Sequence, residues 1–156
     1  MNKLTGAVVF LVLFVGTLCG QVQQKVSVPD GDAVTAIKAV LKSQAEAWNR
    51  GDLEGFMAGY WHSSQLTFMS NSEVTQGWEE TLHRYRQRYQ YAGNQMGKLA
   101  MSWVEPIHLL GADAAYVDGK WQVTMPDGKQ PHGSFTLIFR KLPEGWRIVH
   151  DHTCSE

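Results

Sequence analysis

Apolar residues recur every three or four positions over much of the first part of this chain, and at every second position after Gly97. A spacing near 3.6 is typical of an amphipathic helix, and a spacing of two is typical of a strand with one buried face. The pattern therefore predicts helices first and a run of strands afterwards. This order indicates an α+β fold in which a curved, mostly antiparallel sheet wraps around the helices as a partly closed cone. The mouth of such a cone is a natural place for a small ligand.

Two of the expected helices are separated by a turn signal. The first would begin at Asp32, as its cap, and end at Gly51. Its apolar positions are Val34, Ile37, Leu41, Ala45 and Trp48. Asp52 can cap a shorter second helix, because an aspartate accepts hydrogen bonds from the first free backbone N–H groups. That helix would bury Leu53, Phe56, Met57 and Tyr60. We interpret Asn49 and Asp52 as turn and cap residues without a catalytic role.

A strand over 65–70 and a third helix after Gly77 are expected next, with Asn71-Ser72 ending the strand. The helix would bury Trp78, Leu82, Tyr85 and Tyr89. Turn residues then separate four further strands, the last of which is the C-terminal segment. The apolar faces of the first three are Leu99, Met101 and Trp103; Ala115, Val117, Trp121 and Val123; and Phe135, Leu137 and Phe139.

The C-terminal segment ends in two histidines separated by one residue. Strict alternation places one set of side chains on a single face: Trp146, Ile148, His150, His152 and Cys154. The opposite face would carry Arg147, Val149, Asp151 and Thr153. An apolar strand that ends in paired imidazoles predicts the floor of a pocket. Asp151 is expected outside that pocket, at a dimer surface with Arg147.

The first twenty residues read as an export signal, with one lysine followed by an apolar run from Ala7 to Leu18. We predict a signal peptide over 1–20, a flexible leader over 21–31, and one domain over 32–156. An uncleaved anchor or a lipid-modified Cys19 are the alternatives, although Leu18 is a poor residue before a lipidated cysteine. The mature protein would be periplasmic or secreted. Cys154 would then be its one cysteine, which is buried, paired with another chain, or reactive.

The charge balance argues against nucleic acid as a partner. The chain has 14 Lys and Arg residues against 15 Asp and Glu residues, a formal net charge of -1. Binding to phosphates needs a concentrated basic surface, which this composition does not favour.

Two local motifs in this order of elements resemble the nuclear transport factor 2-like superfamily, specifically its SnoaL-like and DUF4440 branch. The first motif spans Ala47–Phe56 (AWNRGDLEGF), and the second spans Gly145–His152 (GWRIVHDH), with Gly77-Trp78 between them. The resemblance implies a cone with a pocket, dimers formed through the outer face of the sheet, and functions that range from isomerases and dehydratases to binding and assembly proteins. Fold does not select among these functions.

The resemblance also allows a comparison with ketosteroid isomerase, the best-known enzyme of the superfamily. Aligned through the first motif, its carboxylate base falls near Phe68 or Met69, and its tyrosine falls near Gln44. Its second acid falls among Phe135 and Thr136. None of these roles is filled, so the alignment predicts against steroid isomerase chemistry, which requires a base.

His150 and His152 are the first candidates for catalysis, because imidazole can act as base, acid or ligand near neutral pH. Two such histidines could also hold a metal with His132 or His62, but no regular ligand spacing supports this, and we predict neither metal nor cofactor. Glu105 interrupts an apolar strand face and could be an inward-pointing carboxylate, unless the strand bulges there and leaves it in water.

The chain has six tryptophans and five tyrosines, which predict an aromatic lining for a flat or apolar molecule. The expected lining residues are Trp48, Tyr60, Trp78, Trp103, Trp121, His150 and His152. Two hypotheses follow from these residues. The protein is a binding or assembly module for a small, partly apolar ligand, and forms a homodimer. Alternatively, it is a pocket enzyme that transfers a proton, with a histidine as base assisted by Glu105 or Tyr60.

Overall fold

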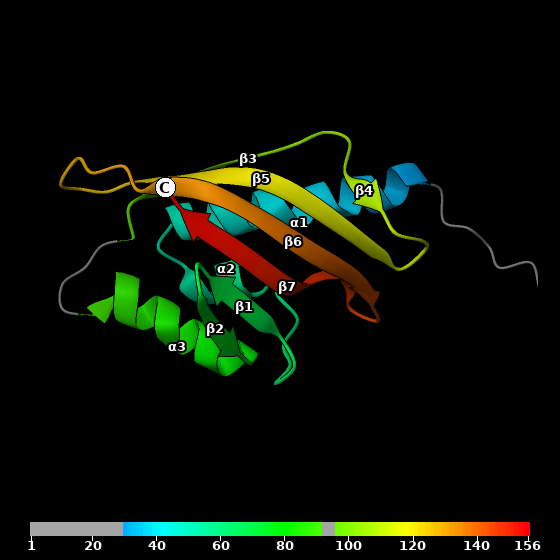
Figure 1. The fold of residues 1–156 in the computed structure, drawn as a ribbon, viewed down its shortest axis with the longest axis horizontal. Helices are drawn as coiled ribbons and strands as arrows, with labels where there is room; N and C mark the ends of the chain where they lie inside the picture. The colour runs from blue at the N-terminus through cyan, green and yellow to red at the C-terminus, as the bar shows by residue number, and fades with distance from the viewer. Residues whose placement is uncertain (1–29, 92–95) are drawn as a thin grey trace, which may run out of the picture.

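The computed structural model describes residues 30–91 and 96–156 of the chain. Figure 1 shows three helices and a curved sheet in this part of the chain. The elements in chain order are α1 (Asp30–Asn49), α2 (Leu53–Met57), β1 (Thr67–Ser70), β2 (Glu73–Gln76), α3 (Trp78–Tyr89), β3 (Lys98–Trp103), β4 (His108–Leu109), β5 (Ala114–Thr124), β6 (His132–Leu142) and β7 (Gly145–Ser155).

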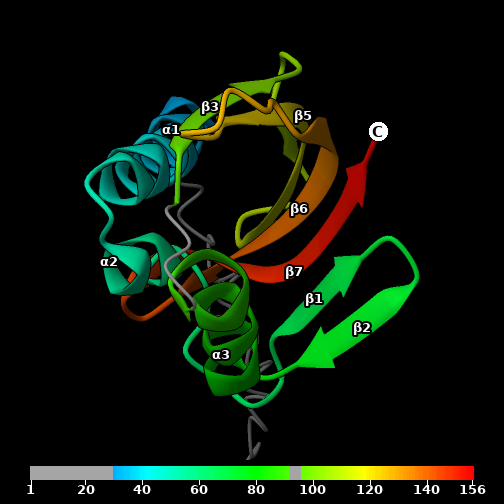
Figure 2. The same ribbon diagram turned by 90° about the vertical axis from the view of Figure 1, so that its left-hand side faces the viewer.

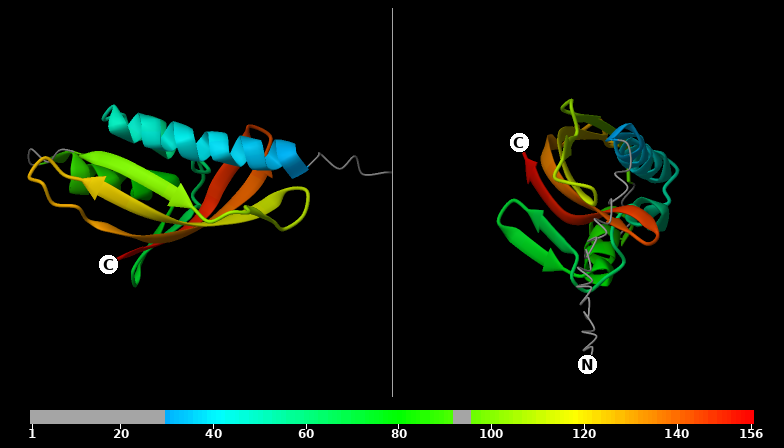
Figure 3. Two further views of the ribbon diagram at one scale, coloured as in Figure 1. Left: turned by 90° about the horizontal axis from the view of Figure 1, so that it is seen from above. Right: turned by 90° about the vertical axis from the view of Figure 1, so that its right-hand side faces the viewer.

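The strands form one mixed sheet, whose order is β2-β1-β7-β6-β5-β3, with β4 paired to β5. All its pairs are antiparallel except the pair of β1 and β7, which is parallel. In Figure 2 the sheet curves around an interior that the helices border on the other side. Figure 3 shows α1 lying along the length of the sheet. The predicted α+β cone is therefore confirmed.

The core lies between the concave face of the sheet and the buried side of α1. Ile37 and Leu41 from the helix and Phe139 and Ile148 from the sheet are fully enclosed. Helix α1 begins at Asp30, so Asp32 lies within its first turns and the prediction that Asp32 caps it is wrong. Within α1, Gln44 is buried where the apolar pattern favoured Ala45.

Strands β2 and β4 were not expected from the sequence. Residues of β2 are mostly exposed, and Val74 is 58% exposed, so the strand has no buried face that would give an alternating pattern. It pairs with β1 through a tight turn in which Asn71 has a positive φ of 53°. Strand β4 is two residues long, which is too short for a detectable period.

The junction of α1 and α2 follows the local sequence closely. Gly51 has a φ of 77°, which is the left-handed conformation that ends a helix. The Asp52 carboxylate accepts a hydrogen bond of 2.8 Å from the backbone N–H of Gly55. Asn49 does more than form a turn: its amide donates to the Leu99 carbonyl and accepts from the Leu99 N–H, at 3.0 and 2.8 Å. It thereby ties the end of α1 to β3.

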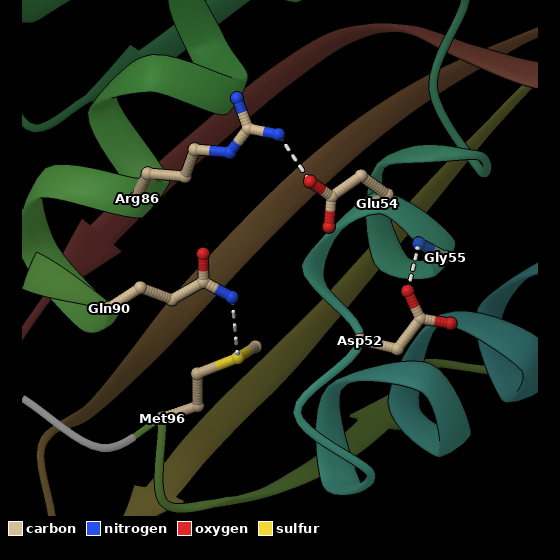
Figure 4. Close-up of polar contacts among 6 residues, drawn as sticks. All are labelled: Asp52, Glu54, Gly55, Arg86, Gln90 and Met96. Carbon is tan, nitrogen blue, oxygen red and sulfur yellow. Dashed lines mark hydrogen bonds and ion pairs between the residues drawn. The ribbon is translucent and has the colours of Figure 1, made fainter.

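Figure 4 shows polar contacts around this junction and the facing side of α3. Arg86 of α3 forms an ion pair with Glu54 of α2, which joins two helices that are distant in sequence. The Gln90 amide, next to the end of α3, donates to the sulfur of Met96 at 3.8 Å. Both contacts hold α3 against the rest of the fold.

The predicted signal peptide over 1–20 and most of the leader lie outside the described residues, so export and the fate of Cys19 stay predictions. Gly31, at the end of the expected leader, belongs to α1. In residues 30–91 and 96–156, no helix is long and apolar enough to cross a membrane.

Replacing Asp52 with alanine should lower the free energy of unfolding by about 1 kcal/mol, because the Gly55 N–H loses its acceptor. Asp52→Asn, which keeps a side-chain oxygen at the cap, is the control and should retain most of the stability. Urea denaturation of both variants measures the difference. Equal losses in the two variants would contradict a capping role.

Candidate functional site

A single unpaired residue in β7 determines which of its side chains enter the cone. In the ladder between β6 and β7, Phe139 is opposite Ile148 and Ile138 is opposite His150. Val149 therefore has no partner in β6, which is the arrangement of a β-bulge. One extra residue reverses the faces of every side chain that follows it.

The reversal sends Asp151, Thr153 and Ser155 inward and leaves His150 and His152 on the outer face. Before the bulge, the predicted direction of the side chains is correct, since Trp146 and Ile148 are buried as expected. The prediction that the two histidines border the pocket is wrong, and so is the prediction that Asp151 lies outside it.

On the outer face, Cys154 is half-buried and its sulfur lies 3.5 Å from Nε2 of His152. Partial burial, with a smaller effect of the nearby His152, lowers the pKa of His150. His150 is paired with Thr67 of β1 and with Ile138 of β6, so it lies in the middle of the sheet.

The interior of the cone holds a cavity of ≈ 100 Å³. Its walls come from all three helices and from β1, β3, β5, β6 and β7. Its apolar and aromatic lining consists of Trp48, Phe56, Tyr60, Phe68, Tyr85, Tyr89, Leu99, Met101, Trp121, Val123, Phe135 and Leu137. Its polar lining consists of Gln44, Ser70, Arg84, Arg88, Asp151, Thr153 and Ser155. Such a mostly apolar wall with a few polar groups is the usual composition of a small-molecule site.

Among the described residues that line this cavity, Asp151 is the one carboxyl group. It is 3% exposed and accepts two short hydrogen bonds, from the Tyr60 hydroxyl at 2.7 Å and from the Thr153 hydroxyl at 2.6 Å. Burial raises the pKa of Asp151 to about 6, against the opposing effects of these two hydrogen bonds and of His152. The carboxyl group therefore gains and loses its proton close to neutral pH.

Tyr60 and Tyr85 reinforce this environment. Burial, and then the charge of Asp151, raise the pKa of both phenols well above the ordinary value. Both hydroxyls are therefore protonated at any physiological pH, and Tyr60 acts as a fixed donor toward Asp151.

Edge-to-face ring contacts hold the aromatic wall in place. The Trp48 ring lies 5.1 Å from Phe56 and 4.8 Å from Tyr89, and Phe56 lies 5.3 Å from Tyr85. These centroid separations are in the favourable range for aromatic pairs. The Trp48 indole also donates to the Met96 carbonyl at 3.0 Å. The wall is therefore a connected aromatic network that spans α1, α2 and α3.

The tryptophans expected at a ligand site divide between the cavity and other places. Trp48, Tyr60 and Trp121 line the cavity. Trp78 does not: its indole donates to the Met57 carbonyl at 2.9 Å, and its ring stacks on His62. Trp103 also lies elsewhere, in a shallow hollow beside α1.

Glu105 is an exposed residue outside the cavity, so it is not the inward carboxylate that the sequence allowed. It pairs with Lys38 at 2.5 Å and accepts from the Trp103 indole at 3.1 Å. The hydrogen bond from Lys38, followed by that from Trp103, lowers the pKa of Glu105, which keeps it ionised.

The described residues contain no cluster of three or more His, Cys, Asp or Glu side chains that could hold a metal ion. The two histidines considered as further ligands are engaged elsewhere. His62 lies 3.1 Å from Glu79, and the His132 ring contacts the Gln130 carbonyl at 3.0 Å.

The positions aligned with the isomerase residues do reach the cavity. Gln44, Phe68 and Phe135 all line it, whereas Met69 and Thr136 lie on the outer face. A carboxyl group and a tyrosine are nevertheless present, as Asp151 and Tyr60, from other positions in the chain. After His150 the one apolar residue is Cys154, which shares a face with His150 and His152, so the alternation alone gave no signal that Asp151 points inward.

A curved sheet that closes on helices around an interior cavity defines the class of nuclear transport factor 2-like proteins. The model of the SnoaL-like domain matches residues 37–154, and the chain belongs to this family. None of the curated proteins that we compared matches the chain.

Solved structures agree with this assignment. A nuclear transport factor 2-like protein of unknown function from Shewanella oneidensis is 38% identical to this chain and has a TM-score of 0.71. The aligned region covers 77% of this chain and 97% of the Shewanella chain. A ketosteroid isomerase-like protein from Erwinia carotovora is 19% identical and has a TM-score of 0.64, and the aligned region covers 80% of this chain and 96% of the Erwinia chain. A putative calcium/calmodulin-dependent protein kinase type II association domain from Thiobacillus denitrificans is 19% identical and has a TM-score of 0.63. The aligned region covers 76% of this chain and 94% of the Thiobacillus chain. The last two share the fold.

Asp151→Asn should stabilise the protein at neutral pH and leave its stability little changed in acid. The folded state keeps the Asp151 proton up to a pKa of about 6, whereas the unfolded chain releases it near the ordinary aspartate pKa of 3.8. The contribution of Asp151 to stability is therefore lost as the pH rises from about 4 to 6, and the total cost is about 3 kcal/mol. Asparagine has a similar shape and carries no charge.

Urea denaturation of wild type and Asp151→Asn between pH 4 and pH 8 measures this effect. The difference in free energy of unfolding should grow with pH and become constant above pH 7. A difference that does not depend on pH would contradict a raised pKa at Asp151.

Proposed function

We propose that the protein binds a small, partly apolar organic molecule in the cavity, with Asp151 as its polar contact. The observation that carries this proposal is the buried carboxyl group, which meets Tyr60 and Thr153 inside an aromatic wall. A volume of ≈ 100 Å³ suits a molecule about the size of one ring, or one end of a larger molecule.

Energetics support a role for Asp151 in binding. A buried carboxyl group whose pKa is raised costs folding free energy, and a perturbed group in a cavity is a candidate functional residue. The packing of the cone does not require it, because the remainder of the concave face consists largely of apolar side chains. A ligand that donates a hydrogen bond to Asp151 would recover part of this cost.

Proton transfer is the second candidate function, and the pKa of Asp151 favours it. A general base works best when its pKa is close to the working pH, and Asp151 has a pKa of about 6. Tyr60 donates a hydrogen bond to the same carboxyl group and so holds it in position. In this hypothesis Asp151 takes the role that the sequence suggested for a histidine.

A thermal-shift screen of small aromatic and aliphatic metabolites tests the binding proposal directly. We expect at least one compound to raise the melting temperature of the wild type, because a ligand that binds the folded state stabilises it. Asp151→Asn should weaken that binding at least tenfold, as expected for the loss of a hydrogen bond to a charged group.

Asp118→Asn is the matched control, since Asp118 is hydrogen-bonded to Thr136 on the outer face of the sheet. Equal loss of binding in both variants would contradict a role for Asp151. If a bound compound is also converted, retention of turnover in Asp151→Asn would exclude Asp151 as the base.

We further propose that the protein is a homodimer whose interface is the outer face of the sheet. A row of paired residues crosses this face, formed by Thr67, His150, Ile138, Tyr116 and His108. The Tyr116 and His108 rings are stacked, 4.6 Å apart. Apolar and aromatic groups in the middle of a sheet face are a common feature of interfaces.

Ile138→Glu should convert such a dimer to a monomer, because it would place two charges in the middle of the interface. Light scattering coupled to size-exclusion chromatography measures the molecular mass. Lys42→Glu, at an exposed position of α1, is the control and should remain dimeric. A wild type that is monomeric at micromolar concentration would refute the proposal.

A further inference from the structure

The cavity has two cationic side chains in its lining, and the proposed function does not yet use them. Arg84 and Arg88 are one helical turn apart on α3, next to Tyr85 and Tyr89, and all four residues line the cavity. Two arginines therefore line a cavity whose lining contains one carboxyl group, Asp151.

The exposure of side chains along β7 shows which end of the cavity is open. Asp151 is buried, Thr153 is half-buried, and Ser155 is exposed. All three line the cavity on the inward face of the strand. The cavity thus deepens from the C-terminal end of β7 toward Asp151, and hydroxyl groups form its wall nearest the mouth.

Arg84 lies beside this mouth. Its guanidinium group is 5.7 Å from the centre of the Phe68 ring on β1 and pairs with Glu73 of β2 at 2.6 Å. Glu73 is opposite Ser70 in the β1–β2 hairpin, and Ser70 lines the cavity next to Thr153. The guanidinium group of Arg88 lies 5.6 Å from the centre of the Tyr89 ring.

We propose that the ligand is a small organic carboxylate, whose anionic group binds Arg84 and Arg88 at the mouth and whose other end enters the aromatic interior, where Asp151 accepts a hydrogen bond from it. This inference rests on the proposed function, because it names the chemical class of the molecule that the cavity binds.

Electrostatics favour this orientation over the reverse one. A guanidinium group binds a carboxylate through paired, charge-assisted hydrogen bonds, and the Ser70 hydroxyl is a further donor nearby. A carboxylate placed at the inner end would meet Asp151 and be repelled. Aromatic walls also attract cations, but two arginines in the same lining oppose a cationic ligand.

The ion pair between Arg84 and Glu73 predicts that removing a charged group near the mouth strengthens ligand binding. Glu73 is an exposed carboxylate, and its hydrogen bond with Arg84 lowers its pKa, so it is ionised at neutral pH. It therefore competes with an anionic ligand for the same guanidinium group. Removing the charge of Glu73 should therefore strengthen anion binding. If the ion pair only stabilised the structure, removing that charge would weaken anion binding or leave it unchanged.

Three probes of nearly identical shape separate charge from size: benzoate, benzamide and benzamidinium. Titrations of the wild-type protein at pH 7.5, followed by NMR, measure each dissociation constant. We expect benzoate to bind at least tenfold more tightly than benzamide, and benzamidinium to bind most weakly. Equal or tighter binding of the neutral or cationic probe would overturn the inference and leave a ligand-binding cavity in place.

Variants identify the residues responsible. Arg84→Gln and Arg88→Gln should each weaken benzoate binding about tenfold and leave benzamide binding unchanged, because benzamide carries no charge. Arg84→Lys keeps the positive charge and should retain part of the affinity. Arg140→Gln, at an exposed position that pairs with Asp113, is the control and should bind benzoate like the wild type. Glu73→Gln should bind it about twofold more tightly.

The outcomes distinguish this inference from the proposed function. Loss of benzoate and benzamide binding to the same extent in Arg84→Gln would show a general effect on the cavity and overturn the anion site. If none of the three probes binds, the inference is wrong, and the thermal-shift screen decides separately whether the cavity binds any small molecule.

Discussion

Val149 interrupts the pairing of β7 with β6, and the side chains that follow it face the interior in the opposite phase from those that precede it. The polar end of the cavity depends on this one residue. Without the bulge, His150 and His152 would point into the cone, and Asp151 and Thr153 would point away from it. The bulge thus permits one strand to contribute Trp146 and Ile148 to the core and a carboxyl group to the cavity.

Strand β7 contributes both to the apolar core and to the polar end of the cavity. The apolar part of β7 packs against α1 and β6, where the side chains are fully enclosed. Asp151 is equally buried, but it is satisfied by the hydroxyls of Tyr60 and Thr153. Those hydrogen bonds reduce the cost of burying a carboxyl group without removing it, as its raised pKa shows. Proteins commonly accept such a cost at functional sites.

Helix α3 determines what the cavity presents to a ligand. Tyr85 and Tyr89 extend the aromatic wall that starts at Trp48, and Arg84 and Arg88 add positive charge to the same wall. The helix is held by contacts that are independent of the cavity, such as the ion pair between Arg86 and Glu54. The charge of the site can therefore vary through a few residues of α3 while the cone stays unchanged, which is consistent with a fold that has many functions.

Much of the architecture could be predicted because it depends on local patterns. The helical period gave α1 and α3, the Gly51-Asp52 pair gave the turn and cap of α2, and strict alternation gave β3, β5 and β6. Each of these features follows from interactions within a few residues along the chain. Aromatic residues such as Trp48, Tyr60 and Trp121 could likewise be expected inside a cone.

The candidate site could not be predicted in the same way. The phase of β7 after Ile148 depends on hydrogen bonds with β6, so a strand read alone gives the wrong face for His150 and Asp151. The contact between Tyr60 and Asp151 joins residues 91 positions apart, and no local rule pairs them. The sequence by itself determined the helices, the longer strands and most of the apolar interior, because periodicity is a local property. Tertiary structure alone decided which polar groups enter the cavity, because that depends on the register between neighbouring strands.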